Sequence, residues 1–145
     1  MTSFTPRPEQ ADILSYTGGT MGISAVPGSG KTFTLSALAA VLIGKLLGSR
    51  ENRDPNEPDQ EVLIVTFSNA AALNFSARIA SFLTEQGLLP GIGYRVCTLH
   101  SMALEIIRGH TRQLGIADDF VMLDETGSDA LLQRAVDLWL EADQR

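Results

Sequence analysis

The segment Ala25-Val-Pro-Gly-Ser-Gly-Lys-Thr32 has the residue types of a phosphate-binding loop, except that Ala25 stands where the usual pattern has glycine. Gly28 and Gly30 allow a tight turn whose backbone N–H groups point at an anion, and a helix that begins near Lys31 adds its positive end. Lys31 can reach the β- and γ-phosphates, and the Thr32 hydroxyl can bind Mg²⁺, so both are candidate catalytic residues. The segment therefore predicts a nucleoside triphosphate bound with Mg²⁺ by these residues: Ala25, Val26, Pro27, Gly28, Ser29, Gly30, Lys31 and Thr32.

Hydrophobic patterning indicates which elements position this loop. The apolar run Met21 to Val26 is expected to form a strand before the loop, and a long helix is expected after it, as far as Leu47. The run Val62-Leu-Ile-Val-Thr66 is typical of strands covered on both faces. Further along the chain we expect strands at 94–98 and 120–123, helices at 69–83, 101–108 and 128–140, and a polar surface loop at 49–61.

Strands that alternate with helices predict an α/β fold with a parallel sheet. In such sheets, ligands bind beyond the carboxyl ends of the strands. The turns that follow Val26, Thr66 and Thr98 would therefore share one face of the sheet. A glycine-rich turn with a chance lysine is the alternative to a phosphate loop, and the expected strand and helix on either side disfavour it.

Composition excludes several classes of protein. Eleven Lys and Arg residues against 17 Asp and Glu residues give a net charge of −6, which argues against a dedicated nucleic-acid module driven by electrostatics. The lone Cys97 excludes an internal disulfide framework and a cysteine-rich zinc site. No apolar run approaches the length of a membrane span, and Met1 to Gln10 lacks a signal-peptide core. We therefore expect a cytoplasmic domain without a membrane partner.

Three further segments resemble motifs of the UvrD/Rep/PcrA type of superfamily 1 DNA helicases, which often carry an alanine at the start of the phosphate loop. The segment Arg7-Pro-Glu-Gln-Ala11 stands upstream of the loop like the adenine-recognising Q motif of that family. Val65-Thr-Phe-Ser-Asn-Ala-Ala71 resembles its Thr-Phe-Thr-Asn segment, and Thr98-Leu-His-Ser-Met102 resembles its Thr-Phe-His-Ser segment. The similarity covers roughly residues 4–125, and the combination is far more specific than any single motif.

The resemblance implies a RecA-like P-loop NTPase fold that is incomplete in this chain. Residues 1–125 would be the front part of the first RecA-like ATP-binding domain, and residues 126–145 would begin an inserted helical subdomain. The implied cofactors are ATP and Mg²⁺, with Gln10 hydrogen-bonded to adenine through its amide. Three residues would lie near a track of single-stranded DNA: Phe67, Asn69 and His100.

The resemblance also implies the activity of the parent protein, an ATP-dependent 3′-to-5′ DNA helicase with further helicase domains. The chain alone is then expected not to unwind DNA and to hydrolyse ATP negligibly. Departures from the family pattern weaken the expected DNA contact, since Ala70 replaces a common Lys, and Leu99 and Met102 replace common Phe residues. From spacing alone, Phe67 could equally be a core residue, and His100 a capping or buried imidazole.

The segment Phe120-Val-Met-Leu-Asp-Glu125 resembles a strand that ends in an Mg²⁺-binding Asp and a water-activating Glu. It favours one alternative, a small standalone P-loop ATPase or kinase that uses Asp124 and Glu125. A degenerate module that binds a nucleotide or a partner protein is a third possibility. In the helicase family, a Phe-x-x-Leu-Asp segment instead precedes the inserted subdomain, and the following helix would then expose apolar residues: Leu131, Leu132, Val136, Leu138, Trp139 and Leu140.

Overall fold

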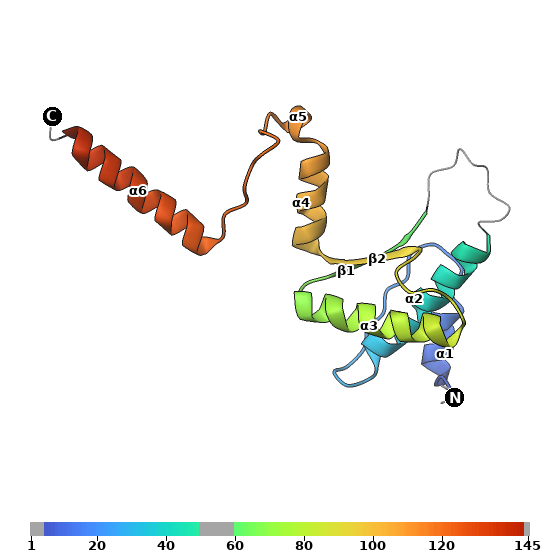
Figure 1. Ribbon diagram of the computed structural model, residues 1–145. Coiled ribbons are helices and arrows are strands. Elements are labelled where there is room, and N and C mark those ends of the chain that lie inside the picture. The colour runs from blue at the N-terminus through green and yellow to red at the C-terminus, as the bar shows by residue number, and fades with distance from the viewer. Residues whose placement is uncertain (1–4, 50–59, 144–145) are drawn as a thin grey trace. The chain divides into compact units, whose positions relative to one another are not determined.

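The computed structural model describes residues 5–49 and 60–143 (Figure 1). The chain divides into two compact units, Met1–Leu104 and Glu105–Arg145. Most of the polar loop expected at 49–61 lies outside the described residues. The division between the two units falls inside helix α4 (Leu99–Gly109).

The N-terminal unit is built around two parallel strands. β1 (Val62–Thr66) and β2 (Tyr94–Thr98) pair in a register that runs from Val62 opposite Tyr94 to Thr66 opposite Thr98. Helix α3 connects the two strands, so the predicted parallel α/β arrangement is confirmed for this pair. The bounds of the other elements of this unit are α1 (Pro8–Leu14), α2 (Lys31–Gly48) and α3 (Asn69–Glu85).

Hydroxyl side chains cap the helices that follow the two strands. Ser68 is the N-cap of α3, and its Oγ accepts a hydrogen bond from the backbone N–H of Ala71 at 3.2 Å. The Oγ1 of Thr98 accepts from the backbone N–H of Ser101 at 3.1 Å in the first turn of α4. Such caps stabilise a helix by about 1 kcal/mol each. They also fix α3 and α4 directly at the carboxyl ends of the strands.

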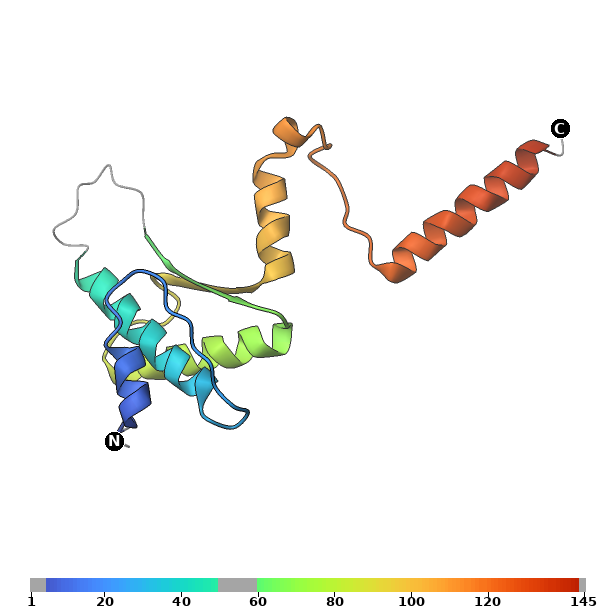
Figure 2. The ribbon, with the colours of Figure 1, turned by 180° about the vertical axis from the view of Figure 1, so that it is seen from behind.

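The core lies between α2, α3 and one face of the sheet. Ile43 on α2 and Ile79 and Leu83 on α3 are fully buried, and each contributes about 1.5–3 kcal/mol by leaving water. Figures 1 and 2 show α2 and α3 against the strands, and the two helices contact each other and β1. Small buried residues on α2, among them Ala40, let α3 approach closely. Partly buried side chains from the strands complete the cluster: Val62, Ile64, Tyr94 and Val96.

Two predicted strands do not form. Residues 21–26 and 120–123 are irregular, because a strand needs a hydrogen-bonded neighbour and the described strands β1 and β2 pair only with each other. The prediction that β1 is covered on both faces is also wrong. Leu63 is 41% exposed and Val65 is 42% exposed, since the core cluster contacts only the alternate residues of the strand.

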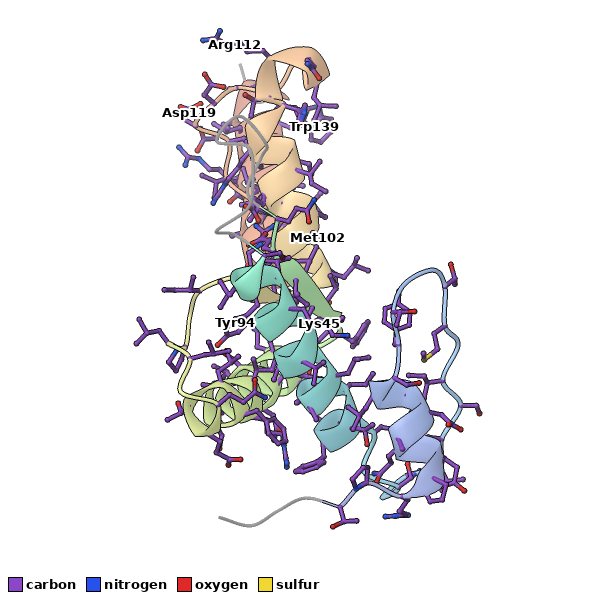
Figure 3. All side chains as sticks on the ribbon, turned by 90° about the vertical axis from the view of Figure 1, so that its right-hand side faces the viewer. Lys45, Tyr94, Met102, Arg112, Asp119 and Trp139 are labelled. Carbon is purple, nitrogen blue, oxygen red and sulfur yellow. The ribbon has the colours of Figure 1, made fainter. Side chains whose placement is uncertain are left out.

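Helix α2 is long and apolar enough to cross a membrane by length and composition, contrary to the expectation that no segment reaches that length. Its place in the core accounts for its composition, because Ala40 and Ile43 are buried against α3. Thr34 and Ser36, two buried polar residues of α2, return their hydroxyl hydrogens to backbone carbonyls of the preceding turn. Lys45, labelled in Figure 3, is in the last turn, where a cation complements the helix dipole.

The C-terminal unit contains the end of α4, the single turn α5 (Thr111–Leu114) and α6 (Glu125–Asp143). The turn α5 was not predicted from the sequence. Helix α6 begins at Glu125 rather than at the predicted Ser128, because Asp124 Oδ1 accepts from the N–H of Gly127 at 2.8 Å. The predicted exposure of its apolar side chains is confirmed, and Trp139 (Figure 3) is 66% exposed.

Candidate nucleotide site

The loop between residues 25 and 30 forms the tight turn that its glycines predict. The N–H of Ser29 donates to the carbonyl oxygen of Val26 at 3.2 Å, which closes the turn. Gly28 has φ +79° and Gly30 has φ +87°, in the left-handed region that L side chains rarely adopt. Glycine at both positions therefore permits the turn that leads directly into α2.

Lys31 is the first residue of α2 and braces this loop. Its Nζ donates to the carbonyl oxygen of Ala25 at 2.6 Å and to that of Val26 at 3.0 Å. An ammonium group has three N–H donors, so one donor stays available for an anion at this end of the loop. Thr32 follows in the same first turn and is half-buried.

A cavity of about 410 Å³ lies between α1 and the loop. Its volume falls within the range of about 300–1,000 Å³ that is common for small-molecule sites. The lining includes Ala25, Val26, Ser29 and Lys31 from the loop and Gln10 from α1, so the structure brings together two segments that the resemblance assigned to one ligand. Four other predicted residues are not part of this lining: Pro27, Gly28, Gly30 and Thr32.

The chemistry of the lining fits a phosphorylated ligand. Ser29 is one of the residues that line the cavity, and its hydroxyl oxygen is buried without a hydrogen-bond partner among the described residues. Buried polar groups are nearly always hydrogen-bonded, so this hydroxyl is a candidate donor to a ligand bound beside the loop. The charged residues of the lining are two cations, Arg7 and Lys31, and one anion, Glu9, and this balance favours a negatively charged ligand.

Gln10 is held by two hydrogen bonds at the other wall of the cavity. Its Oε1 accepts from the backbone N–H of Arg7 at 3.1 Å, and its Nε2 donates to Thr34 Oγ1 at 3.0 Å. Thr34 Oγ1 in turn donates to the carbonyl oxygen of Gly30 at 3.1 Å. Sequence reasoning missed Thr34, because its bond to Gln10 joins residues 24 positions apart and follows only from the folded chain.

A second group of predicted residues lies at the carboxyl ends of the strands. Phe67 follows β1 and is 86% exposed, so it is not a core residue. Asn69 and His100 are exposed in the first turns of α3 and α4, and Thr98 rather than His100 caps α4. Because β1 and β2 are parallel and in register, these three side chains follow the same edge of the sheet.

The two carboxylates at residues 124 and 125 have a local structural role. Asp124 caps α6 through its bond to Gly127, and the segment before it is not a strand. Glu125 is exposed in the first turn of α6. Within residues 5–49 and 60–143, no three His, Cys, Asp or Glu side chains gather as they do in a metal site formed by the protein alone.

Comparison with known proteins gives one family over nearly the whole chain. The family model described as the UvrD/REP helicase N-terminal domain matches residues 7–145. The chain is 31% identical to the ATP-dependent DNA helicase PcrA of Leuconostoc citreum, over 94% of the chain and 17% of that protein. It is 29% identical to the PcrA helicase of Staphylococcus epidermidis, over 86% of the chain and 15% of that protein. A probable DNA helicase II homolog of Rickettsia conorii is 31% identical over 92% of the chain and 18% of its own length. The chain therefore spans less than a fifth of the length of these relatives.

Proposed function

This chain belongs to the UvrD/REP helicase N-terminal domain family, and on that premise we propose that its cavity between α1 and the phosphate loop binds ATP. The observation that carries the proposal is that one cavity is lined by Lys31, by Gln10 and by Ser29, whose hydroxyl has no hydrogen-bond partner among the described residues. A phosphate oxygen would accept the Ser29 hydrogen and the remaining donor of Lys31. Both bonds would be charge-assisted and therefore stronger than bonds between neutral groups.

The two ends of the cavity suit the two ends of the nucleotide. At the α1 wall, Gln10 keeps a lone pair on Oε1 and a second N–H on Nε2, which suit the adenine ring. At the loop, the Thr32 hydroxyl would contribute to the coordination of Mg²⁺, which neutralises charge on the phosphates. Lys31 and Thr32 are thus the residues that we propose at the reacting end.

We further propose that single-stranded DNA follows the edge of the sheet where Phe67, Asn69 and His100 are exposed. An exposed aromatic ring offers a face for base stacking, which contributes about 1–3 kcal/mol per base in proteins that bind single strands. The net charge of −6 provides little general attraction for phosphates. Stacking on Phe67 would therefore carry more of the binding free energy than phosphate contacts.

For the whole protein we propose a cytoplasmic ATP-dependent DNA helicase that moves 3′ to 5′ on single-stranded DNA. The chain spans less than a fifth of its relatives, so the remaining domains would supply the other half of the ATP site and the second lobe. Loss of an arginine finger alone lowers phosphoryl transfer by about 10³–10⁵-fold. The chain alone is accordingly expected to bind ATP, to hydrolyse it negligibly and not to unwind DNA.

Calorimetric titration of the chain with Mg-ATP tests the nucleotide site. We expect saturable binding by the wild-type chain and no measurable binding by Lys31→Ala, since that variant loses both the loop brace and the phosphate contact. Lys45→Ala is the matched control, because Lys45 is an exposed lysine at the other end of the same helix. Failure of the wild-type chain to bind, or equal binding by Lys31→Ala, would contradict the proposal.

Fluorescence anisotropy with a labelled oligothymidylate tests the DNA edge. Phe67→Ala should weaken binding by about 1–3 kcal/mol, as expected for loss of one stacked base. Leu89→Ala is the control, since Leu89 is similarly exposed but lies before the start of β2 and does not follow the carboxyl end of a strand. Equal affinities of the two variants would exclude Phe67 from the DNA contact.

A further inference from the structure

We infer that Thr34 is a positioning residue that makes the site select adenine over guanine by fixing the orientation of the Gln10 amide. The inference rests on the proposed function, because it takes the cavity to be the nucleotide site. Thr34 is 3% exposed, and its hydroxyl lies between the Gln10 amide and the Gly30 carbonyl. It also contributes to the lining of the cavity.

The two backbone groups at the ends of this series of hydrogen bonds determine the donor and the acceptor of each bond. The backbone N–H of Arg7 can only donate, so the Gln10 atom that faces it at 3.1 Å must be the oxygen. The Gly30 carbonyl can only accept, so Thr34 gives it the single hydroxyl hydrogen. The Thr34 oxygen then accepts from Nε2 of Gln10. If the amide turned over, two oxygens would meet at Thr34 and two N–H groups at Arg7.

The fixed amide offers one lone pair and one N–H to a ligand, in a set order. Adenine carries an amino donor at N6 beside the N7 acceptor, and this pair matches one lone pair and one N–H. Guanine carries two acceptors, O6 and N7, so the fixed Oε1 would face O6 with no hydrogen between them. An amide that could rotate freely would turn Nε2 toward O6 and would accept guanine more readily.

A purely structural role for Thr34 explains only part of this arrangement. A threonine in a helix commonly returns its hydroxyl hydrogen to the carbonyl four residues earlier, and Ser36 does this toward Thr32 at 2.7 Å. The bond that Thr34 accepts from Gln10 is additional and connects α1 to α2. Ser36 is also fully buried, so it provides a matched control on the same helix that lacks the connection to Gln10.

The test compares dissociation constants for ATP and GTP, measured by calorimetry on the whole 145-residue chain. Thr34→Val keeps the shape of the side chain and removes the hydroxyl. We expect the preference for ATP over GTP to fall about three- to tenfold, the range that one neutral hydrogen bond supports. Thr34→Ser keeps the hydroxyl and should therefore retain the preference for ATP, and Ser36→Ala should leave that preference unchanged. If Thr34→Val does not fold, Thr34→Cys makes the same test with a weak donor of similar size.

A double-mutant cycle with Gln10→Ala separates action through Gln10 from a general effect on the helix. In the Gln10→Ala background, Thr34→Val should leave the ratio of the two dissociation constants unchanged. The inference would be overturned if the preference for ATP fell equally in both backgrounds, or if the ratio were unchanged in the single Thr34→Val variant. ATP binding that depends on Lys31 would in that case still support the nucleotide site. If the wild-type chain binds neither nucleotide, the proposed function fails and the inference fails with it.

Discussion

Helices α3 and α6 carry the same kinds of apolar residue and use them in opposite ways. On α3, Ile79 and Leu83 are fully buried against α2. On α6, Leu132 is 70% exposed and Trp139 is 66% exposed, and none of the described side chains of this helix is buried. Both helices follow from apolar spacing. Helix α3 packs against α2 of its own unit, whereas the described elements of the C-terminal unit do not bury α6.

The comparison shows that helical periodicity predicts an element, whereas burial needs a neighbouring element. Most of the stability of a helix in a protein comes from packing of its apolar face, and isolated helices are marginal in water. The N-terminal unit supplies that packing, and the hydrogen bonds of the nucleotide site depend on the same helix α2.

The largest effect is expected for Ile79→Ala. Removal of a fully buried isoleucine side chain leaves a cavity in the core, which should lower the free energy of unfolding by about 2–5 kcal/mol. Leu132→Ala on α6 should change it by less than about 0.5 kcal/mol, because that side chain is largely exposed. Hydrogen exchange of the α3 amides measures the loss of stability in Ile79→Ala without a contribution from α6. Equal losses in the two variants would remove the contrast between the helices.

Gly30→Ala should have an intermediate effect and should reach the nucleotide site. An alanine at φ +87° costs about 1–2 kcal/mol, and its Cβ would lie 3.4 Å from Gln10 Nε2. We therefore expect lower stability together with weaker ATP binding. Gly91→Ala is the control, since Gly91 has φ +88° and open space around it. If Gly91→Ala weakened ATP binding as much, the loss would reflect general destabilisation and not the site.

Asp124→Ala tests whether the acidic pair belongs to the nucleotide site or only to α6. Loss of the cap should destabilise the helix by about 1 kcal/mol and speed hydrogen exchange in its first turn. ATP binding should be unchanged. Loss of an Mg²⁺-dependent ATP turnover in this variant would instead support the standalone ATPase or kinase that the sequence left open.

These contrasts also show how far the sequence predicts the molecule. The phosphate loop, its helix and the strand pair were predictable, because glycine spacing and β-branched runs are local signals. The predictions of strands at 21–26 and 120–123 were wrong, since an apolar run becomes a strand only beside a hydrogen-bonded neighbour. The bond from Gln10 to Thr34 was missed for the same kind of reason, because it depends on how α1 lies against α2.

Nucleotide binding should leave the tryptophan fluorescence of the chain unchanged. Trp139 is the single tryptophan of the chain, so its emission reports on α6 alone. At 66% exposure, its emission maximum should be close to that of tryptophan in water, and acrylamide should quench it readily. Mg-ATP should change neither property, because no residue of α6 is part of the lining of the proposed site. Emission at a shorter wavelength that returned to the water value on dilution would mean that a second copy of the chain covers α6, as large exposed apolar patches allow. The contrast with α3 would then be one of assembly, with the second layer of α6 supplied by another molecule.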